Sequence, residues 1–197
     1  MALDTMSDVP DEALLVRYGN GDAAAARSLT LRLTPRVLGY AARILGGDRA
    51  EAEDVAQEAM MRLWRVAPDW RQGEAQVSTW LYRVVTNLCT DRLRGRTRRR
   101  SVALDDAPEM PDGTPGAEAG LIQTDRMAAL GSALKILPDR QRQAVVLRHI
   151  EGLTNPEIAA VMDIGVEAVE SLTARGKRAL TALLAGKKAE LGYEDDV

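Results

Sequence analysis

The chain has 197 residues but no phenylalanine, and aromatic residues make up only 4% of it. Aliphatic side chains, chiefly alanine and leucine, must therefore fill the core, and both residue types favour helices. The apolar runs are far shorter than the roughly 18 to 20 residues that span a membrane, and residues 1–11 lack the basic and apolar segments of a secretion signal. We therefore expect a cytoplasmic protein without membrane insertion.

Histidine and cysteine each occur once, as His149 and Cys89. A lone cysteine cannot form a disulfide within the chain, which agrees with a reducing compartment, and we expect Cys89 to be a small buried residue. Asp54 and Glu58 form a carboxylate pair, but no base, nucleophile or metal-ligand set accompanies them. The chain also lacks a P-loop. We expect neither enzymatic activity nor a cofactor or bound metal.

The net charge of the chain is small, but its charged residues are unevenly distributed. The formal net charge is −3, which disfavours a protein that binds DNA alone, because phosphate neutralisation dominates such binding. Residues 92–100 contain six arginines and no acid, whereas residues 105–125 contain six acids and no base. Residues 102–120 are rich in proline and glycine and lack apolar periodicity, which is typical of a linker.

Sustained strand-like alternation is absent from the sequence, so we predict an all-α fold of two small helical domains joined by a flexible linker. The expected bounds are 11–100 for the first domain, 101–121 for the acidic linker and 122–186 for the second domain. Asp22 and Asp48 are predicted N-caps, and Pro35 is expected to break or restart the helix that follows Asp22. Further helices are expected over 48–67, 77–98, 122–136, 139–151, 156–162 and 166–185.

The predicted helix 48–67 has a polar face that carries a methionine. At 100° per residue, Asp54, Glu58, Met61 and Arg65 share about 60° of arc, with Gln57 and Arg62 at its margins, while Ala56, Ala59, Leu63 and Val66 lie opposite. An ordinary amphipathic surface helix would also show this pattern.

This stretch also fits a known pattern. Ala52, Glu53, Asp54, Gln57, Glu58, Arg62 and Trp64 match the pattern A-E-D-x-x-Q-E-x-x-x-R-x-W, which resembles region 2.2 of bacterial extracytoplasmic-function sigma factors. Such chains carry only sigma regions 2 and 4, so the resemblance covers nearly the whole sequence. It implies that core RNA polymerase, through a coiled coil of its largest subunit, binds Asp54, Gln57, Glu58, Met61 and Arg62.

The next helix resembles the part of the family that holds the separated −10 strand. The pattern W-L-x-R-x-x-x-N-x-x-x-D-x-x-R is matched by Trp80, Leu81, Arg83, Asn87, Asp91 and Arg94. The resemblance implies −10 DNA contacts by Trp80, Arg83, Asn87, Asp91, Arg92, Arg94 and Arg96, with the preceding loop 68–78 capturing a flipped base. Alternatively, Trp80 belongs to the core, Asn87 stabilises a helix junction and the arginines form a solvated face.

The C-terminal third predicts a helix-turn-helix. Thr154 and Glu157 have the spacing of a capping box, and helices 156–162 and 166–185 follow, the second of which would enter the major groove. Upstream, Leu137-Pro138 and Arg142 resemble the L-P-x-x-x-R of sigma region 4. The resemblance implies −35 DNA contacts by Val166, Glu167, Glu170, Ser171, Ala174, Arg175, Lys177 and Arg178.

This helix-turn-helix departs from the family in two respects. Asp163 replaces the usual turn glycine, which requires a left-handed conformation at some cost. Glu167, Glu170 and Leu172 stand where the family has hydrogen-bond donors and cations. Because Glu can accept a hydrogen bond from cytosine N4, a changed −35 sequence is possible, and the sequence does not decide whether this helix still reads DNA.

Taken together, the sequence predicts a sigma factor that binds core RNA polymerase and directs promoter recognition, −10 melting and transcription initiation for a stress- or environment-responsive regulon. The family also implies an anti-sigma partner. One alternative is a sigma mimic that sequesters an anti-sigma factor, which the acids at Glu167 and Glu170 favour. Another is a helix-turn-helix repressor with a ligand-sensing N-terminal half, which leaves the 52–64 pattern unexplained.

Overall fold

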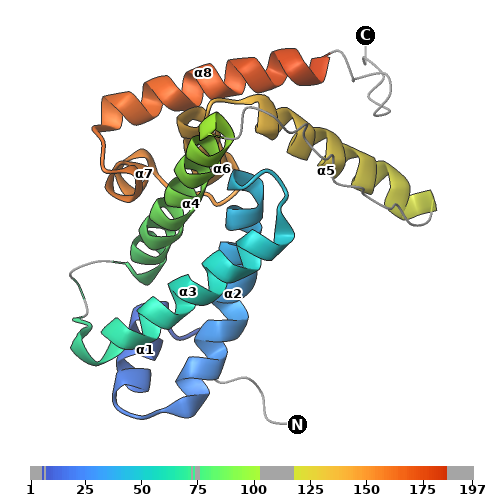
Figure 1. Cartoon of the computed structure of the whole chain (residues 1–197). Helices are drawn as coiled ribbons and strands as arrows, with labels where there is room; N and C mark the ends of the chain where they lie inside the picture. The colour runs from blue at the N-terminus through green and yellow to red at the C-terminus, as the bar shows by residue number, and fades with distance from the viewer. Residues whose placement is uncertain (1–5, 7, 72, 74–75, 103–117, 186–197) are drawn as a thin grey trace.

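The computed structural model describes residues 6, 8–71, 73, 76–102 and 118–185, apart from the side chains of 100–102 and 118–125. All regular structure within these residues is helical, which confirms the predicted all-α class (Figure 1). The helices are α1 (Asp11–Gly19), α2 (Ala23–Ile44), α3 (Arg49–Val66), the 3₁₀ turn η1 (Ala67–Asp69), α4 (Val77–Val102), α5 (Glu118–Ile136), α6 (Asp139–His149), α7 (Asn155–Met162) and α8 (Val166–Ala185).

Helices α1 to α4 form the N-terminal unit. The Asp22 side chain accepts hydrogen bonds from the amides of Ala24 and Ala25, at 2.9 and 3.2 Å, and the Asp48 side chain accepts one from Glu51 at 3.0 Å. Both predicted N-caps are therefore confirmed. These caps fix where α2 and α3 begin, and the two helices pack along their apolar sides.

The predicted break at Pro35 is wrong, because α2 runs without interruption from Ala23 to Ile44. An interior proline removes one backbone hydrogen bond and costs about 3 kcal/mol relative to alanine. Pro35 itself is exposed, while Leu33 and Val37 on either side of it are buried. Burial of a Leu or Val side chain is worth roughly 1.5–3 kcal/mol, so packing of this face outweighs the cost of the proline.

Helices α5 to α8 form the C-terminal unit. Helix α8 lies along the top of the view and packs on α6 and α7, whereas α5 reaches out to the right (Figure 1). The predicted capping box is present: the Glu157 carboxylate accepts a hydrogen bond from the Thr154 amide at 2.7 Å. Asp163 ends α7 in the predicted left-handed conformation, with φ 53° and ψ 54°.

The two units touch each other. Helix α4 packs against α7, and α2 packs against α5 and α6, so one continuous cluster of buried apolar side chains runs through both units. The helices extend into both ends of the range predicted as a linker, since α4 continues to Val102 and α5 begins at Glu118. The rest of that range, 103–117, lies outside the described residues. Within the described part of the chain, no helix is both long and apolar enough to cross a bilayer.

Candidate polymerase- and DNA-binding surfaces

The predicted polymerase-binding residues lie together on the outer side of α3. Asp54, Gln57, Met61 and Arg62 are exposed and Glu58 is half-buried, while Ala56, Ala59 and Leu63 on the opposite side are buried. All five predicted residues line one shallow depression of about 450 Å³, which Leu88 and Arg92 of α4 complete. We call Asp54, Gln57, Glu58, Met61 and Arg62 the docking face.

The docking face combines charge with an apolar contact. Arg62 donates a hydrogen bond to Glu58 at 2.8 Å, one helical turn away. This hydrogen bond, with further attraction from Arg62, Arg65 and Arg92, holds the pKa of Glu58 below its usual value, so the carboxylate stays ionised. Met61 is 43% exposed beside these charges. Such a surface can bind a protein that offers basic groups around an apolar side chain.

A second hollow, which the sequence reasoning missed, adjoins the docking face. It has a volume of about 310 Å³ and is lined mainly by Leu38 of α2 and by Met60, Met61 and Trp64 of α3. Leu31, one turn earlier on α2 than Thr34 of this hollow, is 68% exposed. The helical spacing of Leu31, Thr34 and Leu38 is the sequence signal that could have identified this strip.

The residues predicted to contact −10 DNA lie along α4. Arg83, Asn87, Asp91 and Arg94 are exposed on one side of the helix, and we call these four residues the α4 face. Helix α4 is held in place at its start by the Val77 amide, which donates a hydrogen bond to Glu12 of α1 at 3.0 Å.

Trp80 is half-buried, so its position is intermediate between the two alternatives, a contact with DNA and a place in the core. Its ring meets that of Trp70 edge to face, with the centroids 6.1 Å apart. Trp70 belongs to the predicted base-capturing loop 68–78, parts of which (72 and 74–75) lie outside the described residues. The two indoles place an aromatic pair where that loop meets α4.

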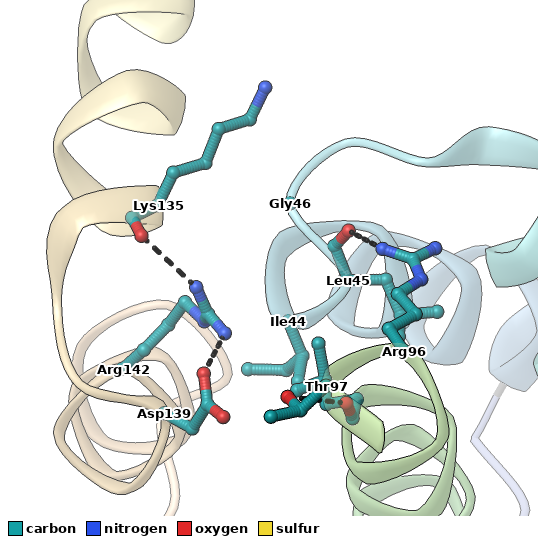
Figure 2. Close-up of a pocket in the computed structure, with 9 residues that line it drawn as sticks. Ile44, Leu45, Gly46, Arg96, Thr97, Lys135, Asp139 and Arg142 are labelled. Carbon is teal, nitrogen blue, oxygen red and sulfur yellow. Dashed lines mark hydrogen bonds and ion pairs between the residues drawn. The ribbon is translucent and has the colours of Figure 1, made fainter. Parts of the chain in front are cut away.

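Two of the predicted DNA-binding arginines have other surroundings. The Arg96 guanidinium lies 2.7 Å from Asp48 and 2.6 Å from Glu51, and it also donates to the Leu45 carbonyl at 3.4 Å (Figure 2). Its charge therefore serves to fasten α4 to the turn between α2 and α3. Arg92 lines the depression of the docking face.

The predicted recognition helix, α8, presents most of its −35 residues to solvent. Val166, Glu167, Glu170, Ala174, Arg175, Lys177 and Arg178 are exposed and Ser171 is half-buried. Asn155 of α7 donates a hydrogen bond to Glu170 at 3.4 Å. Acids therefore occupy the first turns of the exposed face, and cations follow about two turns later.

The arginine of the L-P-x-x-x-R pattern has a structural position. Arg142 is only 5% exposed, and it donates hydrogen bonds to Asp139 and, at 3.5 Å, to the carbonyl of Lys135 (Figure 2). It therefore joins the end of α5 to the start of α6. Cys89 is fully buried as predicted, and burial raises its thiol pKa to about 12.

Comparison with known proteins matches two separate parts of the chain to sigma-factor regions. Residues 29–99 match the model of sigma-70 region 2, and residues 127–180 match that of sigma-70 region 4. The chain is 32% identical to the RNA polymerase sigma-H factor of Pseudomonas aeruginosa over 183 residues, covering 88% of this chain and 93% of the relative. It is 36% identical to the ECF RNA polymerase sigma factor SigE of Mycolicibacterium smegmatis, covering 86% and 66% respectively.

A solved structure agrees with these sequence relatives. CnrH, determined in complex with the cytosolic domain of CnrY, superposes with a TM-score of 0.64 at 26% identity, and the match covers 89% of this chain and 97% of CnrH. Both sigma regions, the identity to named sigma factors over most of the chain and the helical fold lead to one conclusion. The chain belongs to the extracytoplasmic-function group of RNA polymerase sigma factors.

Proposed function

We propose that this chain binds core RNA polymerase through the docking face and directs transcription initiation at a specific set of promoters. The observation that carries the proposal is the single depression that gathers all five residues predicted from the region 2.2 pattern. Its ionised Glu58, exposed Met61 and neighbouring apolar hollow suit a partner helix with basic and apolar side chains. Residues 11–100 would form the domain that does this work.

The same domain would open and hold the −10 element. Separated bases stack on aromatic side chains, and the backbone follows positive charge. The Trp70–Trp80 pair supplies the aromatic surface, and Arg83 and Arg94 of the α4 face supply the charge. Asn87 has the donor and acceptor groups needed to read a base edge.

Residues 122–186 would contact the −35 element through α8, and 101–121 would join the two domains. Arg175, Lys177 and Arg178 are exposed and suited to phosphate contacts, which orient a protein on DNA without reading its sequence. Glu167 and Glu170 can accept from the N4 amino group of cytosine. Such contacts would give a −35 preference that differs from that of relatives with cations at these positions.

An anti-sigma protein would keep the factor inactive until a stress or environmental signal arrives. CnrH, similar to this chain over most of its length, was solved with the cytosolic domain of another protein bound to it. We extend that behaviour to this chain as part of the proposal.

The direct test is transcription in vitro with bacterial core polymerase, this protein and genomic promoter fragments, followed by mapping of the start sites. Discrete start sites that share upstream sequences would support the proposal and give the promoter. Absence of specific starts, in reactions where a known sigma factor works with the same core enzyme, would contradict it.

The docking face itself is tested by the double variant Asp54→Ala with Glu58→Ala. We expect Asp54 and Glu58 to be hot spots of the interface, and hot-spot residues cost about 2 kcal/mol or more each when truncated. Core binding should therefore weaken by at least about 100-fold, while far-ultraviolet circular dichroism stays unchanged. A matched control, Asp8→Ala with Asp69→Ala, removes two exposed carboxylates elsewhere and should bind normally. Unchanged affinity of the first variant would show that polymerase binds elsewhere.

A second candidate function is a sigma mimic that sequesters an anti-sigma protein, and the exposed Glu167 and Glu170 on the recognition helix favour it. The transcription experiment separates the two. A mimic would fail to start transcripts from any genomic fragment, yet would release a related sigma factor from inhibition when an anti-sigma protein is present.

A further inference from the structure

Helices α5, α6 and α8 of the C-terminal unit enclose a pocket of about 310 Å³ that neither the docking face nor the α4 face uses. Helix α8 packs more extensively on α6 than on α5, and it approaches α6 closely at Gly176, where a Cβ atom would lie 2.5 Å from Val145 Cγ2. In Figure 1, α8 runs along the top of the view while α5 slopes down to the right. We call the space that the three helices line the α5–α8 pocket.

The wall of the α5–α8 pocket is aliphatic and comes from all three helices. Leu130 and Leu134 belong to α5, Val145 to α6, and Leu180 and Leu184 to α8. Leu134 and Val145 are only 1% and 4% exposed, so the wall reaches into the core of the unit. Apolar surface that borders a pocket is removed from water when an apolar group enters it, and this wall therefore favours an apolar occupant.

The polar groups of the pocket lie at its solvent-exposed edge. His149 and Lys177 both line the pocket and are both exposed. Within the part of the chain that the structure describes, no carboxylate pairs with Lys177 and no acid lines the pocket. Desolvation and the positive charges of Lys177 and Arg148 hold the pKa of His149 below its usual value, so its imidazole is neutral at pH 7 and can donate one hydrogen bond. A cation and a neutral donor thus meet at this edge.

An aliphatic wall beside an ammonium and an imidazole fits one class of ligand. Small-molecule sites of about 300–1,000 Å³ combine an apolar lining with a few polar groups that fix the orientation of the ligand. The wall can hold an unbranched hydrocarbon chain, and Lys177 and His149 can donate charge-assisted hydrogen bonds to a carboxylate at its end. A helix of a partner protein fits less well, because it is about 10–12 Å across with its side chains.

We propose that the α5–α8 pocket binds a medium-chain aliphatic carboxylate, with the hydrocarbon chain against the aliphatic wall and the carboxylate on Lys177 and His149. The pocket shares no residue with the docking face, so this binding does not depend on polymerase. Lys177 is also among the residues expected to contact −35 DNA, and a carboxylate on its ammonium would compete there with DNA phosphate. That consequence, unlike the binding itself, rests on the proposed function.

The first experiment titrates octanoate, decanoate and dodecanoate separately into the full-length chain by calorimetry, below the concentrations at which they form micelles. We expect a single saturable site, with an affinity that rises by up to about fourfold for each added CH₂ group while the ligand still fits the pocket. Decanol, which lacks the charge, should bind more weakly than decanoate. Absence of saturable binding, or an affinity that does not change with chain length, would overturn the proposal.

The second experiment removes the cation at the edge of the pocket. Lys177→Met keeps the length of the side chain but not its ammonium, so decanoate should bind about threefold to tenfold more weakly, while decanol should bind as before. The matched control is Lys135→Met, because Lys135 is an exposed lysine of α5 that does not line this pocket. Equal weakening by both substitutions would show general charge attraction and overturn the proposal.

The third experiment fills the pocket from its exposed side. Thr181 lines the pocket and is exposed, whereas its neighbour Ala182 is exposed but does not line it. Thr181→Phe should weaken decanoate binding at least about tenfold, because the ring takes the space of two or more CH₂ groups of the ligand, and Ala182→Phe should leave it unchanged. Circular dichroism checks that both variants stay folded. Unchanged binding by folded Thr181→Phe would overturn the proposal.

These outcomes are separable from failure of the proposed function, because the titrations contain neither polymerase nor DNA. A chain that starts transcripts with core polymerase but does not bind decanoate is a sigma factor without this ligand site. A chain that binds decanoate as described, yet neither binds core nor starts transcripts, supports the α5–α8 pocket and contradicts the proposed function.

Discussion

At the scale of single residues, Gly176 shows how closely α8 approaches α6. A Cβ atom at this position would lie 2.5 Å from Val145 Cγ2 and 3.2 Å from the Gln141 carbonyl oxygen. Gly176→Ala should therefore destabilise the C-terminal unit by up to about 2 kcal/mol, because an overpacking cost of about 1–3 kcal/mol exceeds the gain of about 1 kcal/mol in helix propensity. Urea unfolding followed by circular dichroism measures the change.

Gly131 of α5 provides the matched control for that substitution. A Cβ atom built there meets no other heavy atom within 4 Å, so Gly131→Ala should stabilise the protein by up to about 1 kcal/mol. If both substitutions stabilise the protein to the same extent, the close approach of α8 to α6 at Gly176 is wrong.

Several residues were predictable because their environment is local. Asp22 and Asp48 lie just before apolar periodic segments, and Asp163 lies in the short turn between two helices, where a left-handed residue commonly ends the first helix. The buried position of Arg142 was not predictable, since its hydrogen-bond acceptor, the carbonyl of Lys135, belongs to another helix. The ion pairs of Arg96 with Asp48 and Glu51 were not predictable either, because these partners are distant in sequence. The contact of Arg96 with −10 DNA stays a prediction.

At the scale of elements, the sequence predicts helix starts better than helix continuity. Residues near each start signal its position through side chains that bond to nearby amides. Whether α2 survives Pro35 depends instead on the free energy gained when its apolar side packs on α1, α3 and α4. That gain comes from residues elsewhere in the chain, which a local rule for proline does not include.

The capping box of α7 gives a pH-dependent prediction at this scale. Hydrogen bonds from the Thr154 side chain and backbone hold the pKa of Glu157 below its ordinary value of 4.5. A carboxylate with a lowered folded-state pKa stabilises the fold fully above its unfolded value, and the contribution is lost as pH falls through the folded value. Glu157→Gln should therefore cost about 0.5–1 kcal/mol at pH 7, and the difference should shrink below about pH 4.5.

Urea unfolding of both forms at several pH values between 4 and 7 measures this difference. Thr154→Ala serves as a partner variant, since it removes the other half of the box and should make the Glu157→Gln effect smaller. A Glu157→Gln difference that is constant with pH, or that grows in acid, would contradict the arrangement at the start of α7.

At the scale of the whole molecule, the pattern on α3 predicted that the residues of the docking face lie together, but no pattern predicted how the two units meet. The members of the docking face lie within two to three turns of one helix, so spacing alone brings them together. Tyr82 and Glu151 are 69 positions apart in sequence, and neither belongs to a periodic feature that points to the other. The depression also contains Leu88 and Arg92, which only the packing of α4 on α3 could reveal.

The same arrangement predicts how the molecule unfolds. All three tryptophans, Trp64, Trp70 and Trp80, belong to the N-terminal unit, so tryptophan fluorescence reports on that unit, whereas circular dichroism reports on the helices of both. Two-state unfolding requires the two probes to coincide. The packing of α4 on α7 and of α2 on α5 and α6 is less extensive than the packing inside each unit. We therefore expect the two transitions to occur at different urea concentrations.

Removing the polar contacts between the units should widen this difference. Without the Tyr82–Glu151 hydrogen bond and the Arg43–Glu151 ion pair, each unit should unfold at the urea concentration set by its own core. Tyr82→Phe with Glu151→Ala should therefore separate the fluorescence and circular dichroism midpoints further, while Gly131→Ala should shift the circular dichroism transition alone. Coincident transitions in every variant would mean that the two units unfold as one cooperative block.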